Sequence, residues 1–324
     1  MAKTIHWGII GLGNIAHKFA TDLLTVEGGK LYAVASRNQE KADAFANKYK
    51  APKAYDTYEA LAKDPNIDAV YIATPHALHH ENTLLCLEHG IAVLCEKPFA
   101  MNADEVEKMI AKAKEKNVLL MEALWTYFLP HYQYVLKALK SETYGKVLKL
   151  EADFGFNRPF DDTSRLFNKA LGGGSLLDIG IYPIFAALST LGKPKSIESE
   201  ATYFENGADS SCHMVFDYGN DVKAILKSTL IEDTATEAIF YCERGTIKIN
   251  TMFHMPTTVT LIPKTGTAET IDFNYKTIGY NYEAIHFTKL LQEGKTESDV
   301  MTFEFSQQLI KTLDQVRNLI NLEY

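Results

Sequence analysis

The chain has 324 residues, a length that predicts about two domains of ordinary size. Hydrophobic residues make up 46% and charged residues 23%, which excludes a disordered protein, a collagen and a small disulfide scaffold. The net charge is −8 and no long run of Lys or Arg is present, so the composition argues against a nucleic-acid partner and against binding to an anionic membrane surface.

The cysteines and the apolar stretches indicate the compartment. Each cysteine lies in an apolar stretch and no two form a C-x-x-C pair, a pattern typical of buried thiols in a reducing compartment. A strand pattern begins at Thr4, so we expect no signal peptide before the fold. The longest nearly apolar run, 179–192, contains Pro183 and is shorter than a membrane span requires. We therefore expect a cytoplasmic protein. The cysteines are Cys86, Cys95, Cys212 and Cys242.

Short apolar runs alternate with helical periodicity over the first part of the chain. In a helical segment, apolar residues recur on one face at Val106, Met109, Ile110 and Ala113. Strands that alternate with helices predict a parallel, doubly wound α/β sheet with right-handed crossovers. The expected strands are 5–10, 31–36, 68–73, 91–95 and 118–121.

The pattern changes after Tyr144. A helical stretch over 175–191 is followed by strands with period-2 alternation, such as the one that carries Cys212, Met214 and Phe216 on one face. Tight-turn signals separate these strands and predict a mainly antiparallel sheet, with helices over 282–292 and 303–322 after it. The turn signals are Asn206-Gly207, Gly219-Asn220, Arg244-Gly245 and Thr265-Gly266.

A glycine turn follows the first expected strand. Gly11-x-Gly13-x-x-Ala16 matches the dinucleotide-binding fingerprint, in which the glycines allow a tight turn and a close approach of backbone to a pyrophosphate. Asn14 and Ile15 open the following helix, whose free N–H groups and dipole attract phosphate. The alternative is a turn that serves packing only.

The end of the second expected strand indicates which dinucleotide binds. An NAD site places an acidic residue there to hold the ribose, but this chain has Ser36 and Arg37, and the nearest acids, Glu40 and Asp43, fall in the next helix. Arg37 can form a bidentate contact with a 2′-phosphate and Ser36 can donate to it. The pattern favours NADP over NAD; the alternative is a solvated surface arginine.

Two further segments carry chemical groups. Glu96-Lys97-Pro98 follows a strand, where ligands bind at the carboxyl ends of parallel sheets, and Lys97-Pro98 is a candidate cis peptide. In the glycine-rich segment 171–182, Ser175 is a candidate helix cap. Asp178 and Tyr182 are four residues apart and so share a helix face. Burying both is costly unless they are used, either chemically or as hydrogen-bonded core groups.

Together these motifs resemble the glucose–fructose oxidoreductase and inositol dehydrogenase family (Gfo/Idh/MocA) nearly end to end. The match includes Thr74-Pro75 with His79. The resemblance implies a Rossmann domain at 1–122 and a domain with an open, mainly antiparallel sheet at 123–324, used for substrate binding and oligomerisation. The C-terminal helices then either stay with the second domain or pack back on the first. The residues implied beside the coenzyme are Gly11, Gly13, Asn14, Ile15, Ser36, Arg37, Thr74, Pro75, His79, Glu96 and Lys97.

The resemblance also implies the catalytic roles. Lys97 matches the family lysine, Asp178 the acid of the glycine-rich helix and Tyr182 the proton donor. Tyr182 stands where inositol-dehydrogenase-like members have His; tyrosine there, like the segment 122–130, is similar to the dimeric dihydrodiol dehydrogenases and the NADP-dependent aldose (xylose-type) dehydrogenases. That subgroup implies a homodimer or homotetramer. It also implies substrate contacts from Trp125, Phe154 and Tyr280, although aromatic residues more often fill cores.

We expect an NADP-preferring oxidoreductase that acts on a CH–OH group of a small polyol, aldose or trans-dihydrodiol. A phenol has a pKa of about 10, so Tyr182 needs a cation such as Lys97 nearby to act as a base near neutrality. Asp178 is expected to orient Lys97 or the substrate hydroxyl. Arg158 and Arg165 precede the glycine-rich helix, and each is expected either to bind a polar substrate group or to form a surface ion pair.

Three alternatives remain open. The first is an NAD(P)-dependent cyclitol or sugar dehydrogenase, and the second is a cofactor-sensing regulator without turnover. Such regulators need not keep both the lysine and the tyrosine. The third is a purely structural subunit, against which the intact phosphate turn argues. His76, His79 and His80 have a spacing at which a metal is conceivable, but no acidic or cysteine partner is spaced for it, and we expect no metal.

Overall fold

The computed structural model describes residues 3–324, which form two compact units. The first unit comprises the chain up to Trp125 together with Lys276–Ile310. The second unit comprises Thr126–Tyr275 and Lys311–Tyr324.

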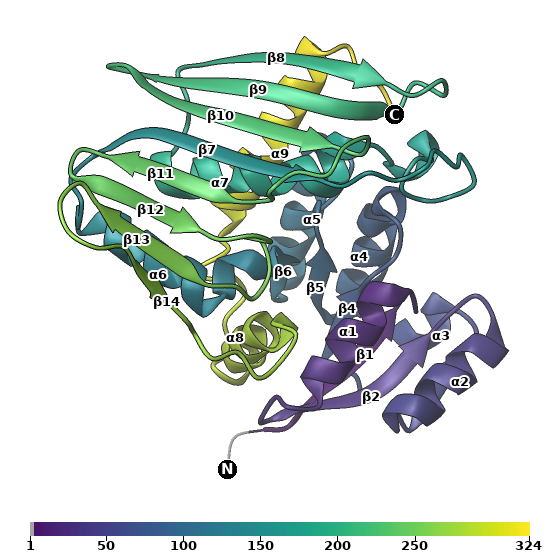
Figure 1. Ribbon diagram of the computed structural model, residues 1–324. Helices are drawn as coiled ribbons and strands as arrows, with labels where there is room; N and C mark the ends of the chain where they lie inside the picture. Colours follow the sequence, from purple (N-terminus) through teal and green to yellow (C-terminus); the bar gives the residue numbers. More distant parts are fainter. Residues whose placement is uncertain (1–2) are drawn as a thin grey trace. The chain divides into compact units, whose positions relative to one another are not determined.

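The first unit is built on a six-stranded parallel sheet in the order β3-β2-β1-β4-β5-β6 (Figure 1). This is the order of a dinucleotide-binding doubly wound fold, so the expected fold class is confirmed. The strands are β1 Ile5–Ile10, β2 Gly29–Ala35, β3 Lys53–Tyr55, β4 Ala69–Ile72, β5 Ala92–Glu96 and β6 Leu120–Ala123. The helices are α1 Asn14–Leu23, α2 Gln39–Tyr49, α3 Tyr58–Ala62, α4 His79–Glu88, α5 Ala103–Lys116 and α8 Tyr280–Gln292, with the 3-10 turn η1 His76–Leu78.

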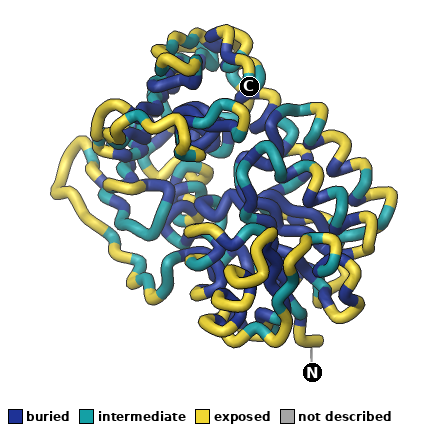
Figure 2. Tube along the Cα trace, turned by 90° about the vertical axis from the view of Figure 1, so that its right-hand side faces the viewer, coloured by how far each residue is buried: buried dark blue, intermediate teal, exposed yellow. Residues whose placement is uncertain are grey.

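The central strands of this sheet are buried along their whole length. Every residue of β4 and β5 is buried, because helices cover both faces of a parallel sheet. Figure 2 marks such positions in dark blue. Five strands lie within two residues of the expected bounds. The edge strand β3 was not expected, since its three residues pair with β2 alone and are too few to show a period.

The second unit is built on an eight-stranded sheet in the order β14-β13-β12-β11-β7-β10-β9-β8. Strands β7 and β10 pair in parallel, and the other neighbours are antiparallel, which confirms the mainly antiparallel sheet. The strands are β7 Val147–Gly155, β8 Ser196–Tyr203, β9 Asp209–Gly219, β10 Val222–Thr229, β11 Ala238–Cys242, β12 Gly245–Ile249, β13 Val259–Pro263 and β14 Glu269–Ile271. The helices are α6 Pro130–Lys140 and α7 Ile181–Leu191, with the 3-10 turn η3 Lys169–Leu171 and the π-helical turn η4 Leu176–Gly180. The turn η2 Trp125–Phe128 and the helix α9 Phe303–Leu319 each include residues of both units.

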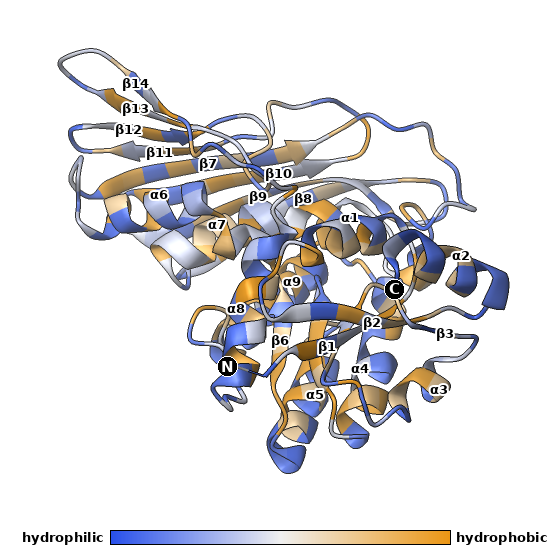
Figure 3. Cartoon of the chain, turned by 90° about the horizontal axis from the view of Figure 1, so that it is seen from below, coloured by the Kyte–Doolittle hydropathy of each residue, from blue (hydrophilic) through white to orange (hydrophobic). Residues whose placement is uncertain are grey.

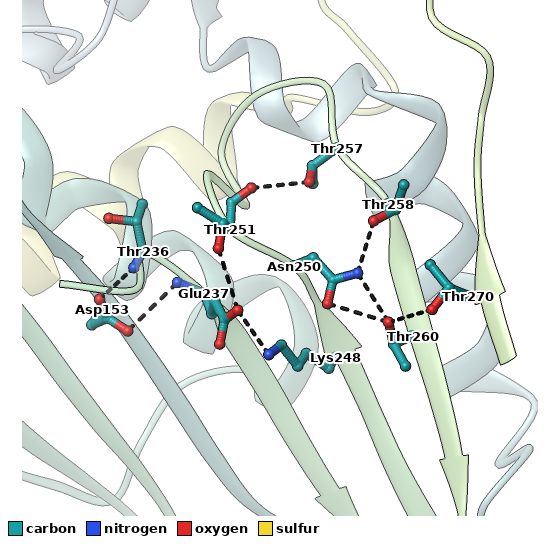
Figure 4. Close-up of polar contacts among 10 residues, drawn as sticks. All are labelled: Asp153, Thr236, Glu237, Lys248, Asn250, Thr251, Thr257, Thr258, Thr260 and Thr270. Carbon is teal, nitrogen blue, oxygen red and sulfur yellow. Dashed lines mark hydrogen bonds and ion pairs between the residues drawn. The ribbon is translucent and has the colours of Figure 1, made fainter. Parts of the chain in front are cut away.

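The two faces of the second sheet differ in polarity. Alternate residues of β9, among them Cys212, Met214 and Phe216, are fully buried on the face that α6 and α7 cover (Figures 1 and 3). On the opposite face, at and near β12 to β14, several polar side chains are bonded to one another. Asn250 donates to the hydroxyls of Thr258 (2.7 Å) and Thr260 (2.9 Å), as Figure 4 shows. This alternation is the one expected of a sheet with one covered face.

The helical stretch that ends with α7 is longer than the apolar run identified in the sequence. It extends over Lys169–Leu191 and has the length and composition of a membrane span, which corrects the expectation of a run that is too short. In the structure 89% of its most apolar window is buried inside the protein. A helix that is apolar on all sides is expected in such a core position.

The last two helices differ from the expected bounds at one end each. Helix α8 begins at Tyr280, two residues before the expected start. Helix α9 ends at Leu319 instead of 322, because Asn321 adopts a positive φ of 51° and the Leu322 N–H returns to the Arg317 carbonyl at 2.9 Å. This arrangement is a left-handed C-terminal cap.

Candidate functional site

The glycine turn leaves space above the first turn of α1. Gly11 has φ +86°, and a Cβ there would lie 2.7 Å from the Ala73 backbone at the end of β4, so only glycine fits. A Cβ on the exposed Gly13 would meet nothing within 4 Å among the described residues. Gly13 is also the N-cap of α1, and no side chain of residues 3–324 caps the helix there, so the first N–H groups, at Asn14 and Ile15, have no side-chain cap. This cradle fits a pyrophosphate.

The end of β2 carries a buried hydroxyl and an exposed cation. Ser36 is 8% exposed and its hydroxyl accepts the Asn38 N–H at 3.3 Å. Asn38 in turn caps α2 by accepting the Lys41 N–H at 2.8 Å. Arg37 is exposed beside Tyr58; burial raises the pKa of Tyr58, and the guanidinium opposes that rise. Arg37 therefore places a positive charge just after the end of β2.

Two carboxylates hold the backbone around Lys97. Glu96, the last residue of β5, is 9% exposed; it accepts a hydrogen bond from the Tyr71 hydroxyl and one from the Lys97 N–H at 3.2 Å. The Lys97–Pro98 peptide is cis, as the sequence suggested. The Phe99 N–H donates to Glu122 on β6 at 3.0 Å. The loop that presents Lys97 is thus bonded at both ends to side chains of neighbouring strands.

His79 connects two loops of the first unit through hydrogen bonds of its ring. It is fully buried, with Nδ1 2.8 Å from the Pro98 carbonyl and Nε2 2.9 Å from the Thr74 carbonyl. Both carbonyls accept from the ring at once only if it carries two protons. Among residues 3–324 no group of three or more His, Cys, Asp or Glu side chains is arranged to hold a metal ion. The histidine joins the Thr74-Pro75 turn to the Lys97 loop.

Two aromatic residues proposed for substrate stack on each other. Trp125 follows β6 and Tyr280 is the first residue of α8; their ring centroids lie 4.3 Å apart at 13°. They are 5% and 4% exposed. The pair is a buried aromatic stack that carries one hydroxyl and one indole N–H.

The glycine-rich segment of the second unit is held from β9. Gly174 has φ +123°, and a Cβ there would lie 2.1 Å from Asp209 Oδ1, so no other residue fits. Ser175 was expected to cap the helix, but its hydroxyl donates to Asp209 at 2.7 Å, and Asp209 also accepts the Leu176 N–H at 2.6 Å. Asp209 therefore takes the capping role that the sequence assigned to Ser175. Burial raises the pKa of Asp209 to about 7, although these two hydrogen bonds act to lower it.

Asp178 and Tyr182 have different partners within this unit. Asp178 lies in the π-helical turn η4, a feature frequent at functional sites, and forms an ion pair with Arg165 at 3.2 Å. Tyr182 is 5% exposed in a cluster of rings: its centroid lies 5.7 Å from that of Phe154 and 4.8 Å from that of His254. Sequence analysis did not identify His254, because it follows β12, far along the chain from Tyr182, and no regular spacing relates the two segments.

The site residues predicted from sequence are shared between the two units. The first unit contains Gly11, Gly13, Asn14, Ile15, Ser36, Arg37, Thr74, Pro75, His79, Glu96, Lys97, Trp125 and Tyr280. The second contains Phe154, Arg165, Asp178 and Tyr182.

Family models match both units. Residues 5–124 match the model described as an oxidoreductase family with an NAD-binding Rossmann fold, and residues 132–248 match the GFO/IDH/MocA C-terminal domain. These matches confirm the resemblance inferred from the motifs.

Curated relatives extend over nearly the whole chain. A trans-1,2-dihydrobenzene-1,2-diol dehydrogenase of Xenopus laevis is 36% identical over 98% of each chain. The scyllo-inositol 2-dehydrogenase (NADP(+)) IolU of Bacillus subtilis is 35% identical over 99% of this chain and 98% of its own.

Solved structures show the same fold. An aldose-aldose oxidoreductase from Caulobacter crescentus, complexed with glycerol, superposes with a TM-score of 0.90 at 21% identity. The 3-ketoreductase KijD10 from Actinomadura kijaniata, in complex with NADP and TDP-benzene, superposes with a TM-score of 0.88 at 24% identity. Each match covers 98% of both chains.

Proposed function

Because this chain belongs to the GFO/IDH/MocA family of oxidoreductases, we propose that it transfers a hydride between NADP and a CH–OH carbon of a small polyol, aldose or trans-dihydrodiol. One observation carries the proposal. The open turn at Gly13, the cation Arg37 and the amine-bearing Lys97 all follow the carboxyl ends of parallel strands of one sheet, at β1, β2 and β5. Ligands of doubly wound sheets bind at that edge.

The residues favour NADP as the coenzyme. Asn14 and Ile15 would hold the pyrophosphate through their backbone N–H groups, and Arg37 with Ser36 would hold the 2′-phosphate. No carboxylate of the described chain follows β2 directly, and the nearby Asp43 accepts a hydrogen bond from Gln39 at 2.7 Å. The NADP specificity in the name of the relative IolU agrees with this assignment. When bound, the nicotinamide supplies the carbon that gives or takes the hydride.

Proton transfer is assigned to Tyr182. In oxidation its phenolate takes the proton of the substrate hydroxyl, and in reduction the phenol returns it. A phenol has a pKa of about 10, so this role near neutrality requires positive charge close to the ring. Lys97 supplies that charge and stabilises the negative charge that develops on the substrate oxygen. Asp178, fixed by Arg165, orients the polar groups around the reacting carbon.

Oxidation of a cyclitol is the second candidate. The 35% identity to a scyllo-inositol 2-dehydrogenase over nearly the full length of both chains favours it. Tyr182 at the family's proton-donor position favours the dihydrodiol and aldose substrates instead. A cofactor-sensing regulator without turnover is disfavoured because the lysine and the tyrosine are both present.

A substrate panel tests the proposal. Purified protein is assayed with aldoses, cyclitols and trans-dihydrodiols, each with NADP⁺ and with NAD⁺, by the absorbance of the reduced nicotinamide. We expect turnover with NADP⁺ and with a dihydrodiol or an aldose. Turnover with cyclitols alone selects the second candidate. Binding of NADP⁺ without turnover of any substrate contradicts both.

A further inference from the structure

One carboxylate binds the start of helix α8 through four consecutive peptide groups. Asp22, on the last turn of α1, is 2% exposed. Its Oδ2 accepts the N–H groups of Gly279 and Tyr280, both at 2.8 Å, and of Asn281 at 3.3 Å. Its Oδ1 accepts the N–H of Ile278 at 3.1 Å. All of these residues belong to the first unit.

Helix α8 depends on this external cap. Its N-cap residue is Gly279, which has no side chain to satisfy the N–H groups that every helix leaves free at its start. A carboxylate at that end also interacts favourably with the helix dipole, and its bonds to N–H groups are charge-assisted. Asp22 therefore determines where α8 begins and in which direction its first side chain points.

The first side chain of α8 is Tyr280, which stacks on Trp125. Helix α1 thus has the open glycine turn at one end and holds this aromatic pair at the other. The contact between Asp22 and α8 is buried, so no solvent molecule replaces it at low cost.

We propose that Asp22 is a positioning residue for the Trp125–Tyr280 pair. The inference deepens the proposed function and rests on it, together with the expectation from the family resemblance that this pair contacts the substrate. Asp22 touches neither ring in this role; it fixes the peptide groups of 278–281, and these fix the Tyr280 ring against Trp125. Loss of the carboxylate then shifts the ring and weakens substrate binding, whereas the chemical step, assigned to other residues, keeps its rate.

The test replaces the carboxylate by an amide. Asp22→Asn keeps the size of the side chain, but it removes the negative charge and leaves one accepting oxygen in place of two, because the NH₂ group cannot accept an N–H bond. The chain has two tryptophans, Trp7 and Trp125, so Trp7→Phe leaves Trp125 as the sole tryptophan, whose emission is excited selectively at long wavelength. In this background, without substrate, we expect Asp22→Asn to shift the Trp125 emission. In the otherwise native chain we expect amide exchange at 278–281 to accelerate about tenfold or more, since the single amide oxygen replaces only one of the two carboxylate oxygens and the remaining bonds are no longer charge-assisted.

Kinetics provide the functional readout. We expect Asp22→Asn to raise the substrate KM about five- to tenfold with kcat nearly unchanged, as for a misplaced binding surface. The matched control is Asn102→Ala, which removes the cap of α5, where Asn102 accepts the Glu105 N–H at 2.9 Å. That variant loses a cap in the same unit but is expected to leave the Trp125 emission and KM unchanged.

The outcomes separate this inference from the proposed function. If Asp22→Asn leaves both the emission and the exchange at 278–281 as they were, the inference is overturned. If the emission shifts and KM does not, the positioning stands and the assignment of the pair to substrate is wrong. If Asp22→Asn does not fold, Asp22→Glu is measured in its place: a shifted emission supports the inference, and an unshifted one with normal KM overturns it.

Discussion

Arg165 fixes the carboxylate of Asp178, with both terminal guanidinium nitrogens 3.2 Å from the same oxygen, Oδ1. The Asp178 side chain is 12% exposed and that of Arg165 is 43% exposed. An ion pair with one exposed partner contributes little to stability, typically about 0–1 kcal/mol. Its main effect is therefore on the direction of the carboxylate, which lies one turn before Tyr182 on the glycine-rich segment.

Replacement of Arg165 is expected to impair activity without unfolding the protein. Arg165→Leu releases the Asp178 carboxylate, and we expect kcat/KM to fall by roughly tenfold or more while the melting temperature changes little. The control is Arg158→Leu, in the same segment, where the guanidinium lies 5.9 Å from the Phe156 ring and has no assigned role. If both variants keep full kcat/KM, the pair is an ordinary surface contact.

Tyr182→Phe removes the proton carrier and retains the ring. Because the ring still packs against Phe154 and His254, we expect the fold and the affinity for NADP to persist. We expect kcat to fall by ~10²–10⁴, the usual contribution of a positioned acid or base. Tyr218→Phe, a change on β9 of the same unit, is the control and is expected to be silent. Turnover near that of the wild type would remove Tyr182 from the mechanism.

Lys97→Met removes the positive charge and keeps the length of the side chain. We expect kcat to fall by ~10²–10⁴, because the proposed mechanism requires the positive charge of Lys97 for proton transfer and for the charge on the substrate oxygen. NADP affinity, measured by fluorescence titration, is expected to remain within a few-fold, since the phosphate contacts lie elsewhere. The control is Lys116→Met, whose amine pairs with Glu88 at 2.7 Å on the surface of the same unit. Equal turnover in the two variants contradicts the role of Lys97.

The coenzyme preference is tested at Arg37. Because the guanidinium would pair with the 2′-phosphate, Arg37→Ala is expected to weaken NADP⁺ binding by roughly 10- to 100-fold, as for a lost hydrogen bond to a charged group. NAD⁺ lacks that phosphate, so its affinity is expected to change little. Lys41→Ala, an exposed change on α2, controls for the general loss of charge. A parallel loss for both coenzymes would contradict the assignment.

The sequence predicts those features that depend on nearby residues. The bounds of β1 are as expected, because apolar residues, turn glycines and the fingerprint all lie within a dozen positions. The four turn signals of the second sheet also lie between the strands that they were expected to separate. Local spacing suffices for such elements.

Features made by distant partners could not be predicted in this way. Asp209 caps the glycine-rich helix from another strand, and Asp22 caps α8 from the opposite end of the chain sequence. His254 reaches Tyr182 through packing alone. The π-helical turn at Asp178 has no period that distinguishes it from an α-helix. In each case the deciding contact is long-range, and a single sequence contains no record of it.

Buried carboxyl groups surround the Lys97 loop in the first unit. Burial raises the pKa of Glu122 to about 7, and Glu96 adds to the rise. Burial also raises the pKa of Glu283 well above its usual range, and neither of its oxygens has a hydrogen-bond partner among the described residues. Such groups bind protons more tightly in the folded protein than in the unfolded chain, so they reduce stability once the pH exceeds their unfolded pKa.

The Glu122→Gln variant is therefore expected to gain stability relative to the wild type as the pH rises. In the wild type the Glu122 contribution to the free energy of unfolding falls between pH about 4.5 and about 7 and is level above that range. The amide oxygen of Gln still accepts the Phe99 N–H and has no such titration. Urea unfolding at pH 5 and pH 8 should show the difference between variant and wild type growing by on the order of 3 kcal/mol in favour of the variant. The control is Glu107→Gln, an exposed change on α5, which should show no such trend. If the difference between Glu122→Gln and the wild type does not change with pH, Glu122 is already ionised at pH 5 and the prediction is wrong.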